Sequence, residues 1–394
     1  MEENWLSDLD LDLNTTIMFD LNRSEESGAE YNCDTESSIT FQFYTWGVLA
    51  NIITVYGIVG NVLSILVLRH RMMQSSTSIY LISLAVYDTG VLLSMCLFLA
   101  LPTLYLEKGL LEDYYYAYKY MHPFCYPIAL VAQTGTIYTT LAFTVERYIA
   151  VCHPLKAANT CTRSRTKRVI VLIFLCCVIY NIPRFLESET IEVWNEYYNR
   201  TEPQIQQTEL GTSKAYKEVY FIYLQLFIMF LFPFSFLAVL NMQLIRAVKV
   251  AQFTRRQMSV GSSKTPKAPT KEPNLTIMLI AVVMVFLVCQ LPSVIDNILW
   301  TIFDAEILNC SLHYIRFTTL SNLMVVINSA INFVIYCLFG KRFRQVFVKM
   351  FIPCKKRKNQ YKYVMYESTM NSRVGGVQKP NGNGKMYDTE STFL

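Results

Sequence analysis

The segment 274–295 reads NLTIMLIAVVMVFLVCQLPSVI and contains no aspartate, glutamate, lysine or arginine. A helix needs about 20 mainly apolar residues to cross the hydrocarbon core of a bilayer, and this segment is long enough. Six further stretches resemble it, and the only internal charge in them is Asp88. They are 37–68, 78–106, 122–145, 169–183, 219–245 and 317–340. The sequence therefore predicts an all-α membrane protein with seven transmembrane helices.

One of these stretches, 169–183, is shorter than a full span. We expect it to extend to Glu187, with the long side chain of Arg184 reaching towards the membrane interface. The soluble segments between the spans are expected to be loops.

The composition argues against a soluble enzyme. Only 16% of the 394 residues are charged, whereas an average soluble domain has about 25%. The chain has no GxGxxG, GxxxxGK[ST], GxSxG or HExxH motif and no CxxC pair among its eleven cysteines. We therefore expect no enzymatic activity.

The distribution of charge predicts the orientation. Lys and Arg cluster after the first, third, fifth and seventh stretches, and such segments remain on the cytoplasmic side. Before Phe43 the chain carries eleven acids and a single base, Arg23, which places the N-terminus outside the cell. We expect a multi-pass protein of the plasma membrane. Four glycosylation sequons fall on the expected outer side, at Asn14, Asn22, Asn199 and Asn309.

Several polar residues lie where a membrane makes them costly. Asp88 lies in the middle of the second stretch, and Asn61, Asn328 and Asn332 lie in the first and seventh. Such residues face the interior of a bundle and indicate a functional site, although a purely structural role is the alternative. At the cytoplasmic edge of the third stretch stands Arg147, which is either an interfacial anchor or half of an ion pair that can break.

These residues belong to motifs that occur in order along residues 44–351. The motifs are Gly60-Asn61, Leu84–Asp88, Glu146-Arg147-Tyr148 followed by Cys152-His-Pro-Leu155, Pro233, Phe286–Pro292 and Asn328–Tyr336. Together they resemble those of rhodopsin-like (class A) G-protein-coupled receptors. The resemblance implies four regions. They are an acidic extracellular segment (1–43), a seven-helix domain (44–339), a short amphipathic eighth helix (340–353) and a cytoplasmic tail (354–394), in which Cys354 could be palmitoylated.

The resemblance also implies roles for individual positions. An activation switch would hold Arg147 at rest and release it to the G protein; it comprises Glu146, Arg147, Tyr148, Glu272, Asn332 and Tyr336. A polar pocket that admits a sodium ion as an allosteric modulator matches Asp88, Thr136, Asn328 and Asn332, and we expect no other cofactor. A relay that moves the sixth helix comprises Pro233, Phe286, Gln290 and Pro292.

Two departures from the family pattern stand out. Gln290 occupies a position where the family usually has tryptophan. No cysteine lies between Cys177 and Cys289, so the usual disulfide from the third helix to the second extracellular loop cannot form. A bridge between Cys33 and Cys310 is the favoured alternative, with Cys125 as a buried apolar residue. Which of these three cysteines pair stays open.

The ligand class follows from local resemblance. Ala129 stands where amine receptors carry aspartate, and the seventh stretch has no lysine for a retinal. The segments 132–135, 180–185 and 208–210 resemble invertebrate FMRFamide-type neuropeptide receptors. The acidic N-terminus and second outer loop would attract a cationic peptide. The expected partners are therefore an amidated cationic peptide, a heterotrimeric G protein, arrestin, a receptor kinase and membrane lipid, and no nucleic acid.

Specific ligand contacts are a hypothesis. The peptide's arginine would approach Glu187 or Asp296, and its terminal amide would meet Gln133 or Gln290. Its phenylalanine would stack among Tyr138, Tyr223 and Phe227. A peptide similar to thyrotropin-releasing hormone is the alternative ligand. A secondary transporter is a remote alternative, because such proteins carry internal repeats that this chain lacks.

Overall fold

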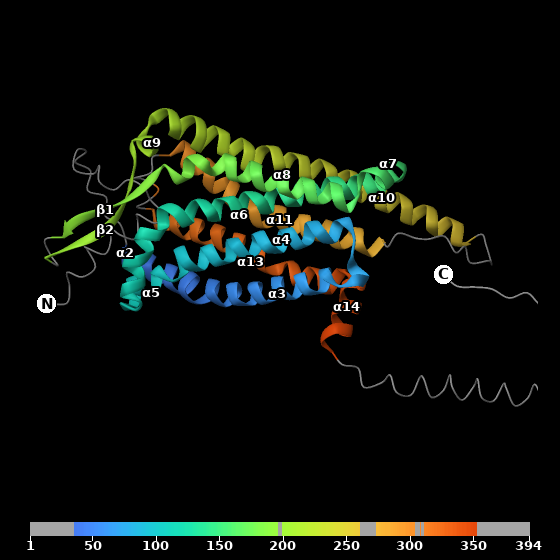
Figure 1. Ribbon diagram of the computed structural model, residues 1–394, viewed down its shortest axis with the longest axis horizontal. Helices are drawn as coiled ribbons and strands as arrows, with labels where there is room; N and C mark the ends of the chain where they lie inside the picture. The colour runs from blue at the N-terminus through green and yellow to red at the C-terminus, as the bar shows by residue number, and fades with distance from the viewer. Residues whose placement is uncertain (1–34, 196–198, 261–272, 304–307, 309–310, 353–394) are drawn as a thin grey trace, which may run out of the picture. The chain divides into compact units, whose positions relative to one another are not determined.

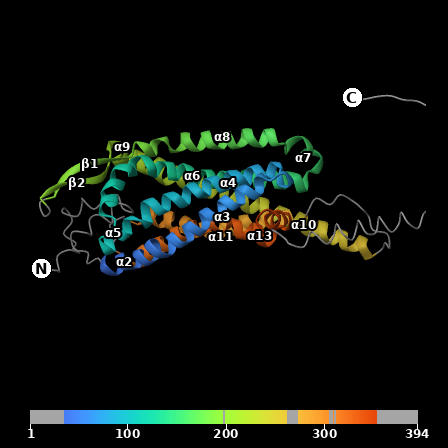
Figure 2. The same cartoon turned by 60° about the horizontal axis from the view of Figure 1, so that its bottom comes forward.

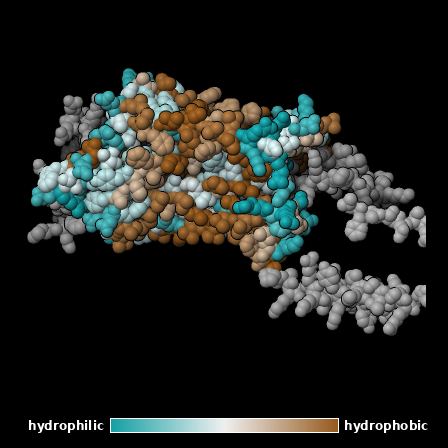
Figure 3. Space-filling model, viewed as in Figure 1, coloured by the Kyte–Doolittle hydropathy of each residue, from teal (hydrophilic) through white to brown (hydrophobic). Residues whose placement is uncertain are grey.

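The computed structural model describes residues 35–195, 199–260, 273–303, 308 and 311–352. Seven helices in this part of the chain are long and apolar enough to cross a membrane, which confirms the predicted fold class. They are Ser37–Arg69, Ser76–Lys108, Glu112–Cys152, Arg163–Phe185, Tyr216–Val250, Ile277–Leu299 and Leu312–Phe339. Figure 3 shows an apolar band across the helices between hydrophilic ends on the face in view.

The spans lie side by side in Figures 1 and 2 and are assembled from several elements. The first three contain α2 (Thr35–Gln42), η1 (Phe43–Ala50) and α3 (Asn51–Arg69); α4 (Ser76–Met95), η3 (Cys96–Ala100) and α5 (Pro102–Lys108); and α6 (Glu112–Cys152). The others contain α8 (Arg163–Asn181) with η4 (Ile182–Phe185); η5 (Tyr216–Leu224), η6 (Leu226–Leu231) and α10 (Phe232–Val260); α11 (Pro273–Ile302); and α13 (Leu312–Phe339). Shorter helices are η2 (Arg71–Met73), α7 (Pro154–Thr160), α9 (Glu209–Thr212) and α14 (Lys341–Phe351).

Local sequence explains where several helices begin and end. The Ser75 hydroxyl accepts the backbone N–H of Ser78 at 3.1 Å and caps α4. Ser311 caps α13 in the same way through the N–H of Tyr314. Gly109 ends α5 with φ of 65°, a left-handed conformation that suits glycine and reverses the chain towards α6.

The first span packs tightly against the second and seventh. A Cβ placed on Gly57 would lie 2.6 Å from the Cβ of Ala330 and 2.7 Å from the Leu92 side chain. Trp46, Ala50, Leu92, Ala100, Leu323, Val326 and Ala330 form a buried cluster at the same junction. Small residues let helix backbones approach closely where lipid supplies little hydrophobic driving force, which explains glycine at position 57.

The outer half of the fifth span is π-helical. Elements η5 and η6 cover nearly all of residues 216–231, and in a π-helix each hydrogen bond closes over five residues in place of four. Each such turn rotates the side chains that follow relative to a regular α-helix. Faces inferred from α-helical spacing are therefore displaced in this segment.

The second outer loop contains a β-hairpin, where the sequence was expected to form only a loop. Strand β1 (Ser188–Asn195) pairs antiparallel with β2 (Arg200–Gln207), with Ser188 opposite Gln207 and Asn195 opposite Arg200. Polar strands of this kind lack the apolar alternation that would have indicated them. The described part of the domain is therefore helical with one added hairpin.

Hydrogen bonds attach this hairpin to the outer end of α6. Thr190 Oγ1 donates to the backbone oxygen of Lys119 at 2.7 Å, and the Tyr120 hydroxyl donates to Glu192 at 3.2 Å. On the other strand, the Tyr116 hydroxyl donates to Glu202 Oε1 at 3.2 Å. These contacts join the loop to the third helix without a disulfide.

The pKa of Glu202 is shifted by its contacts in this attachment. Burial acts to raise the pKa of its carboxyl, but hydrogen bonds from Arg200, Asn195 and Tyr116 outweigh that effect and lower the pKa below its ordinary value. The Arg200 guanidinium donates to Glu202 at 2.8 Å, and this bond raises the pKa of the arginine.

Candidate functional site

Three helices meet at Asp88, near the middle of α4. The carboxylate is completely buried; Oδ1 accepts a hydrogen bond from Thr136 Oγ1 of α6 at 3.1 Å, and Oδ2 accepts one from Asn332 Nδ2 of α13 at 2.7 Å. The structure thus brings together three of the four residues expected for the polar pocket. Because a buried carboxylate is costly unless it is bonded, this network ties α4, α6 and α13 together.

Two asparagines extend the polar region. Asn61 of α3 is buried and donates from Nδ2 to the backbone oxygen of Ser329 at 3.3 Å. Its Oδ1 has no hydrogen-bond partner within the described residues. Asn328 is also buried on α13, but no hydrogen bond joins it directly to Asp88 in the described part of the chain. The unbonded Oδ1 of Asn61 is available to a further partner.

At the C-terminal end of α6, Arg147 is held by its neighbour. Arg147 Nη2 lies 2.6 Å from Glu146 Oε1. The same oxygen also accepts from Ser76 Oγ at 2.9 Å and from Thr77 Oγ1 at 3.2 Å. Oε2 accepts from Thr166 Oγ1 of α8 at 3.2 Å.

The three hydroxyl donors to Glu146 were not anticipated from the sequence. They come from two helices distant in the chain, and an isolated serine or threonine near a helix end is too common to single out. The expected second partner of Arg147, Glu272, lies outside the described residues. Four donors on one carboxylate make this cluster, here called the Glu146 lock, a well-defined structural state.

Two other expected switch residues are Tyr148 and Tyr336, on α6 and α13. The Tyr148 ring meets the His153 ring edge-on at 5.6 Å between centroids. Tyr336 is buried and tilted against Phe343 at 5.5 Å, and its hydroxyl has no hydrogen-bond partner among described residues. Such an unbonded hydroxyl can accept or donate a bond if the helices rearrange.

The expected relay residues lie on α10 and α11. Phe286 is buried and its ring lies 5.8 Å from that of Phe234, which follows the buried Pro233. Gln290 is only 2% exposed, and its Oε1 has no hydrogen-bond partner among residues with a described placement. Pro292 lies inside α11, where it removes a backbone donor.

Glu187 does not face an open ligand site. Its oxygens lie 3.1 and 3.0 Å from Arg184 Nη1, and the Tyr216 hydroxyl donates to Oε2 at 2.6 Å. Arg184 also bonds Gln225. Both charged residues are buried. The expectation that Arg184 reaches the interface is therefore wrong, and Glu187 is already neutralised within the protein.

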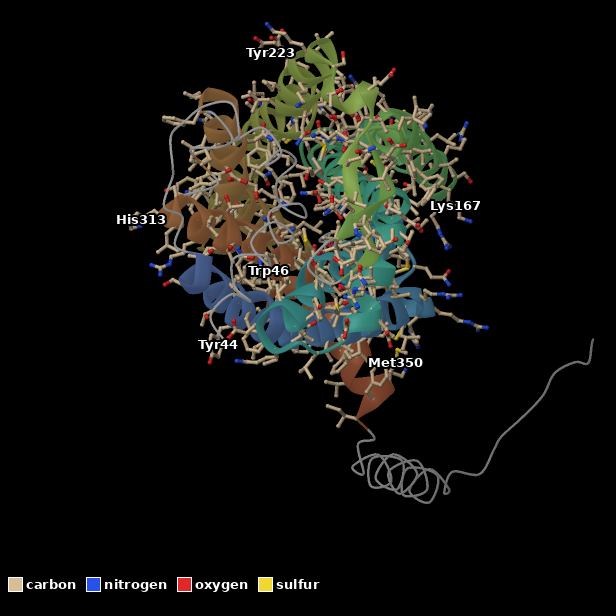
Figure 4. All side chains as sticks on the ribbon, turned by 90° about the vertical axis from the view of Figure 1, so that its left-hand side faces the viewer. Tyr44, Trp46, Lys167, Tyr223, His313 and Met350 are labelled. Carbon is tan, nitrogen blue, oxygen red and sulfur yellow. The ribbon has the colours of Figure 1, made fainter. Side chains whose placement is uncertain are left out.

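The remaining proposed ligand residues divide into two groups. Asp296 is partly buried and accepts a hydrogen bond from Thr318 Oγ1 at 2.7 Å, and Gln133 is partly buried on α6. Tyr223 and Phe227 are 68% and 56% exposed, and Figure 4 shows Tyr223 at the periphery of the bundle. The π-helical turns explain why these two side chains point outward. They are removed from the proposed interior site.

Tyr138 does not lie where we expected it from the sequence, in an aromatic group with Tyr223 and Phe227. Its hydroxyl donates to the backbone oxygen of Ile228 at 3.0 Å, and Tyr138 lines a cavity together with Glu146 and Arg165. It is therefore not part of an outer aromatic group with Tyr223.

Most of the proposed modification sites cannot be placed. Cys33, Cys310, Cys354, Asn14, Asn22 and Asn309 lie outside the described residues. Asn199 is exposed at the turn of the hairpin, with φ of 51°. Cys125 has no disulfide partner within the described part of the chain and packs beside a buried tyrosine cluster that includes Tyr115 and Tyr118.

The chain is similar in sequence to known proteins. The family model for the 7 transmembrane receptor (rhodopsin family) matches residues 60–336. An FMRFamide receptor of Drosophila melanogaster is 32% identical over 345 residues, covering 87% of this chain but only 60% of the relative's length. The FMRFamide peptide receptor frpr-18 of Caenorhabditis elegans is 29% identical, covering 75% of this chain and 67% of the relative.

A vertebrate relative is similar at a lower level. The human thyrotropin-releasing hormone receptor is 27% identical over 347 residues, covering 83% of this chain and 82% of that receptor. The family match covers most of the seven helices and includes the Asp88 network and the Glu146 lock. The chain belongs to the rhodopsin family of seven-transmembrane receptors, which is a family of receptors and not of enzymes.

Proposed function

We propose that this protein is a G-protein-coupled receptor for an amidated FMRFamide-like neuropeptide. Peptide binding on the outside would promote nucleotide exchange on a heterotrimeric G protein inside. Similarity to two FMRFamide receptors supports the ligand class. The observation that carries the signalling role is the Glu146 lock, because it holds Arg147 in one bonded state that a conformational change can break.

The proposed mechanism is a shift between two states. At rest, the lock joins α4, α6 and α8 through Ser76, Thr77 and Thr166. A ligand that binds the active state better shifts the population towards it, by as much as its affinities for the two states differ. In that state Arg147 would be available to the G protein.

A sodium ion would fit at Asp88 as a modulator. One carboxylate with neutral oxygens from Thr136 and Asn328 suits a hard cation of low charge, and the unbonded Oδ1 of Asn61 adds an oxygen in the same polar region. Such an ion would neutralise Asp88 and favour the resting packing of α4, α6 and α13.

The ligand contacts are proposed with Glu187 left out. Asp296 would receive the peptide's guanidinium, because its partly buried carboxylate, bonded by Thr318 and Tyr314, has two oxygens that can accept further hydrogen bonds. Gln290 would receive the terminal amide, because its buried Oε1 lacks a donor and such an atom costs about 1–3 kcal/mol until it is bonded. Gln133 on α6 is the second candidate for the amide.

Further partners and the location follow from the same proposal. The receptor would reside in the plasma membrane with its N-terminus outside, and arrestin, a receptor kinase and anionic lipid would contact its cytoplasmic side. A peptide resembling thyrotropin-releasing hormone is the second candidate ligand, supported by similarity to a receptor for that hormone.

Intracellular calcium in cells that express the full chain with a promiscuous G-protein α subunit tests this proposal. FMRFamide, its free acid, an analogue with citrulline in place of arginine and thyrotropin-releasing hormone form the panel. We expect a response to the amide and little to the acid. Silence towards every peptide, with surface expression verified, would reject the ligand class, and a response to the hormone alone would favour the alternative.

Two variants test the contacts. Asp296→Asn should raise the half-effective concentration of FMRFamide at least tenfold, which is roughly the effect of losing one charge-assisted hydrogen bond. The half-effective concentration of the citrulline analogue should be nearly unchanged. Gln290→Leu should reduce the difference in half-effective concentration between FMRFamide and its free acid. Glu189→Gln, which removes an exposed charge from the hairpin, is the matched control. If Asp296→Asn raised the half-effective concentrations of FMRFamide and the citrulline analogue equally, Asp296 would not bind the arginine of the peptide.

A further inference from the structure

A cavity of about 340 Å³ lies between α6, α8 and α10, beside the Glu146 lock. We call it the α6–α8–α10 cavity. It lies at the opposite ends of these helices from Asp296 and the hairpin, so it is separate from the proposed peptide site. Ligand pockets commonly measure about 300–1,000 Å³, so it is large enough for a small ligand but too small for a whole two-chain lipid.

The walls of the cavity are apolar stripes that run along the helices. Val145 and Ile149 are four residues apart on α6, and Val169 and Ile173 are four residues apart on α8, so each pair lies on one helix face. Phe236 of α10 closes the third side and is itself partly exposed. An extended hydrocarbon chain would bury its surface against these stripes.

One end of the cavity is basic. Arg165, in the first turn of α8, lines it, is exposed, and makes a 3.5 Å hydrogen bond from Nη1 to the backbone oxygen of Asn159. No carboxylate lies within 4 Å of the Arg165 guanidinium among the residues that the structure describes. The nearby Glu146 carboxylate is paired with Arg147 and bonded by three hydroxyls, so its charge is already compensated.

With the basic ends of the helices on the cytoplasmic side, the cavity would lie at the depth of the inner leaflet and border lipid. Arg165 and Ile173 are eight residues apart, or about 12 Å along a helix, which is within one leaflet of a hydrocarbon core about 30 Å thick. The outer faces of the flanking helices are apolar and exposed, with Leu172 60% exposed on α8 and Val239 47% exposed on α10. A membrane-dissolved molecule would therefore reach the cavity from the side.

We propose that the α6–α8–α10 cavity binds a long-chain fatty acid. The acyl chain would lie along the apolar stripes of α6 and α8, and the carboxylate would meet the planar guanidinium of Arg165, which matches it with two parallel hydrogen bonds. Size favours a single chain, and the uncompensated cation favours an anionic head. The site depends on neither the peptide nor the G protein, so it stands or falls separately from the proposed function.

Photoaffinity labelling of the purified full chain in nanodiscs tests this site. The probe is an oleate analogue that carries a diazirine in the chain and a terminal alkyne, and peptide mapping locates the adduct. Four variants are compared. Arg165→Gln removes the cation, and its control Lys167→Gln removes a charge that points away from the bundle in Figure 4. Ala142→Phe fills the cavity, and its control Leu172→Phe adds the same ring on the outer face of α8.

We expect adducts within residues 141–149 or 165–173 and competition by unlabelled oleate. Arg165→Gln should lower labelling about tenfold, as expected for loss of a charge-assisted bond, and Ala142→Phe should abolish it. Both controls should label as the unmodified chain does. Each variant must elute as a monodisperse peak, and its thermal unfolding midpoint, followed with a thiol-reactive dye, must match that of the unmodified chain, so that misfolding is not mistaken for lost binding.

Three results would overturn the proposal. Undiminished labelling in Ala142→Phe would show that the probe does not occupy the cavity. Equal competition by oleyl alcohol and oleate would remove the role of the carboxylate. Stronger competition by lysophosphatidate than by oleate would replace the fatty acid with a phosphate-bearing lipid.

Discussion

The buried pair of Arg184 and Glu187 allows a quantitative test of how the outer end of the receptor is held. Glu187→Gln keeps the shape of the side chain but removes the charge that compensates Arg184. Breaking a buried ion pair from one side costs about 3–5 kcal/mol, because the remaining charge is left buried. The Tyr216 hydroxyl keeps an acceptor in the variant, so most of the loss comes from the arginine.

Replacing both partners should be far less damaging. In Arg184→Met with Glu187→Leu no charge remains buried, and apolar replacements of buried pairs are often neutral or stabilising. Tyr216 and Gln225 would each lose a bond, which costs about 1–2 kcal/mol in total at the net value of a typical hydrogen bond. The double variant should therefore be about 2 kcal/mol more stable than Glu187→Gln alone.

Thermal unfolding in detergent, followed with a thiol-reactive dye, measures these differences. Cys177 and Cys289 are buried and become reactive only when the helices separate. The single variant should unfold roughly 10 °C below the unmodified chain, since 1 kcal/mol shifts a large domain by about 2–4 °C. Glu189→Gln, two residues along, should show no shift. An unfolding midpoint of the single variant within 1 °C of that of the unmodified chain would refute this account. So would a double variant with a midpoint as low as that of the single variant.

Three further outcomes follow from the described contacts. Thr166→Ala removes one of the four donors to Glu146, so the basal rate of nucleotide exchange should rise. The loss of one hydrogen bond to a charged group corresponds to an increase of up to about tenfold. An unchanged basal rate would show that the Glu146 lock does not restrain the resting state. Gly57→Val would force a side chain into Ala330, and we expect a lower unfolding midpoint and reduced surface expression, whereas an unchanged midpoint would contradict the packing. The lowered pKa of Glu202 stabilises the hairpin at every pH above the ordinary value of 4.5, and this contribution disappears as the pH falls through the lower folded value. The β2 amides should therefore be equally protected from hydrogen exchange at pH 7 and at pH 5.5. In Glu202→Gln the same amides should exchange faster at both pH values.

The helices and the central polar network could be predicted because both depend on rules that act locally. A stretch without charges that is long enough to cross the bilayer forms a helix there, since in lipid its backbone groups must bond internally. Asp88 must face the interior for the same reason, and the order of family motifs identified Thr136 and Asn332 as its neighbours. The structure places both within hydrogen-bond distance.

The outer end was predicted poorly because its structure depends on contacts between distant segments. Glu187 looks like a free acid in the sequence, yet its partners include Tyr216, which is 29 residues away. The outward direction of Tyr223 follows from π-helical turns, for which the sequence holds no recognisable signal. The hairpin likewise depends on acceptors and donors along α6 rather than on its own apolar pattern.

The attachment of the hairpin to α6 has a consequence for the redox behaviour of the receptor. Strands β1 and β2 contain no cysteine, and their contacts to Lys119, Tyr120 and Tyr116 are hydrogen bonds. A reducing agent breaks cystine bridges but leaves such bonds intact, so the position of this loop is independent of the thiol–disulfide balance of the medium. The same loop is instead sensitive to ionic strength and acidity, because charged side chains take the place of a covalent link.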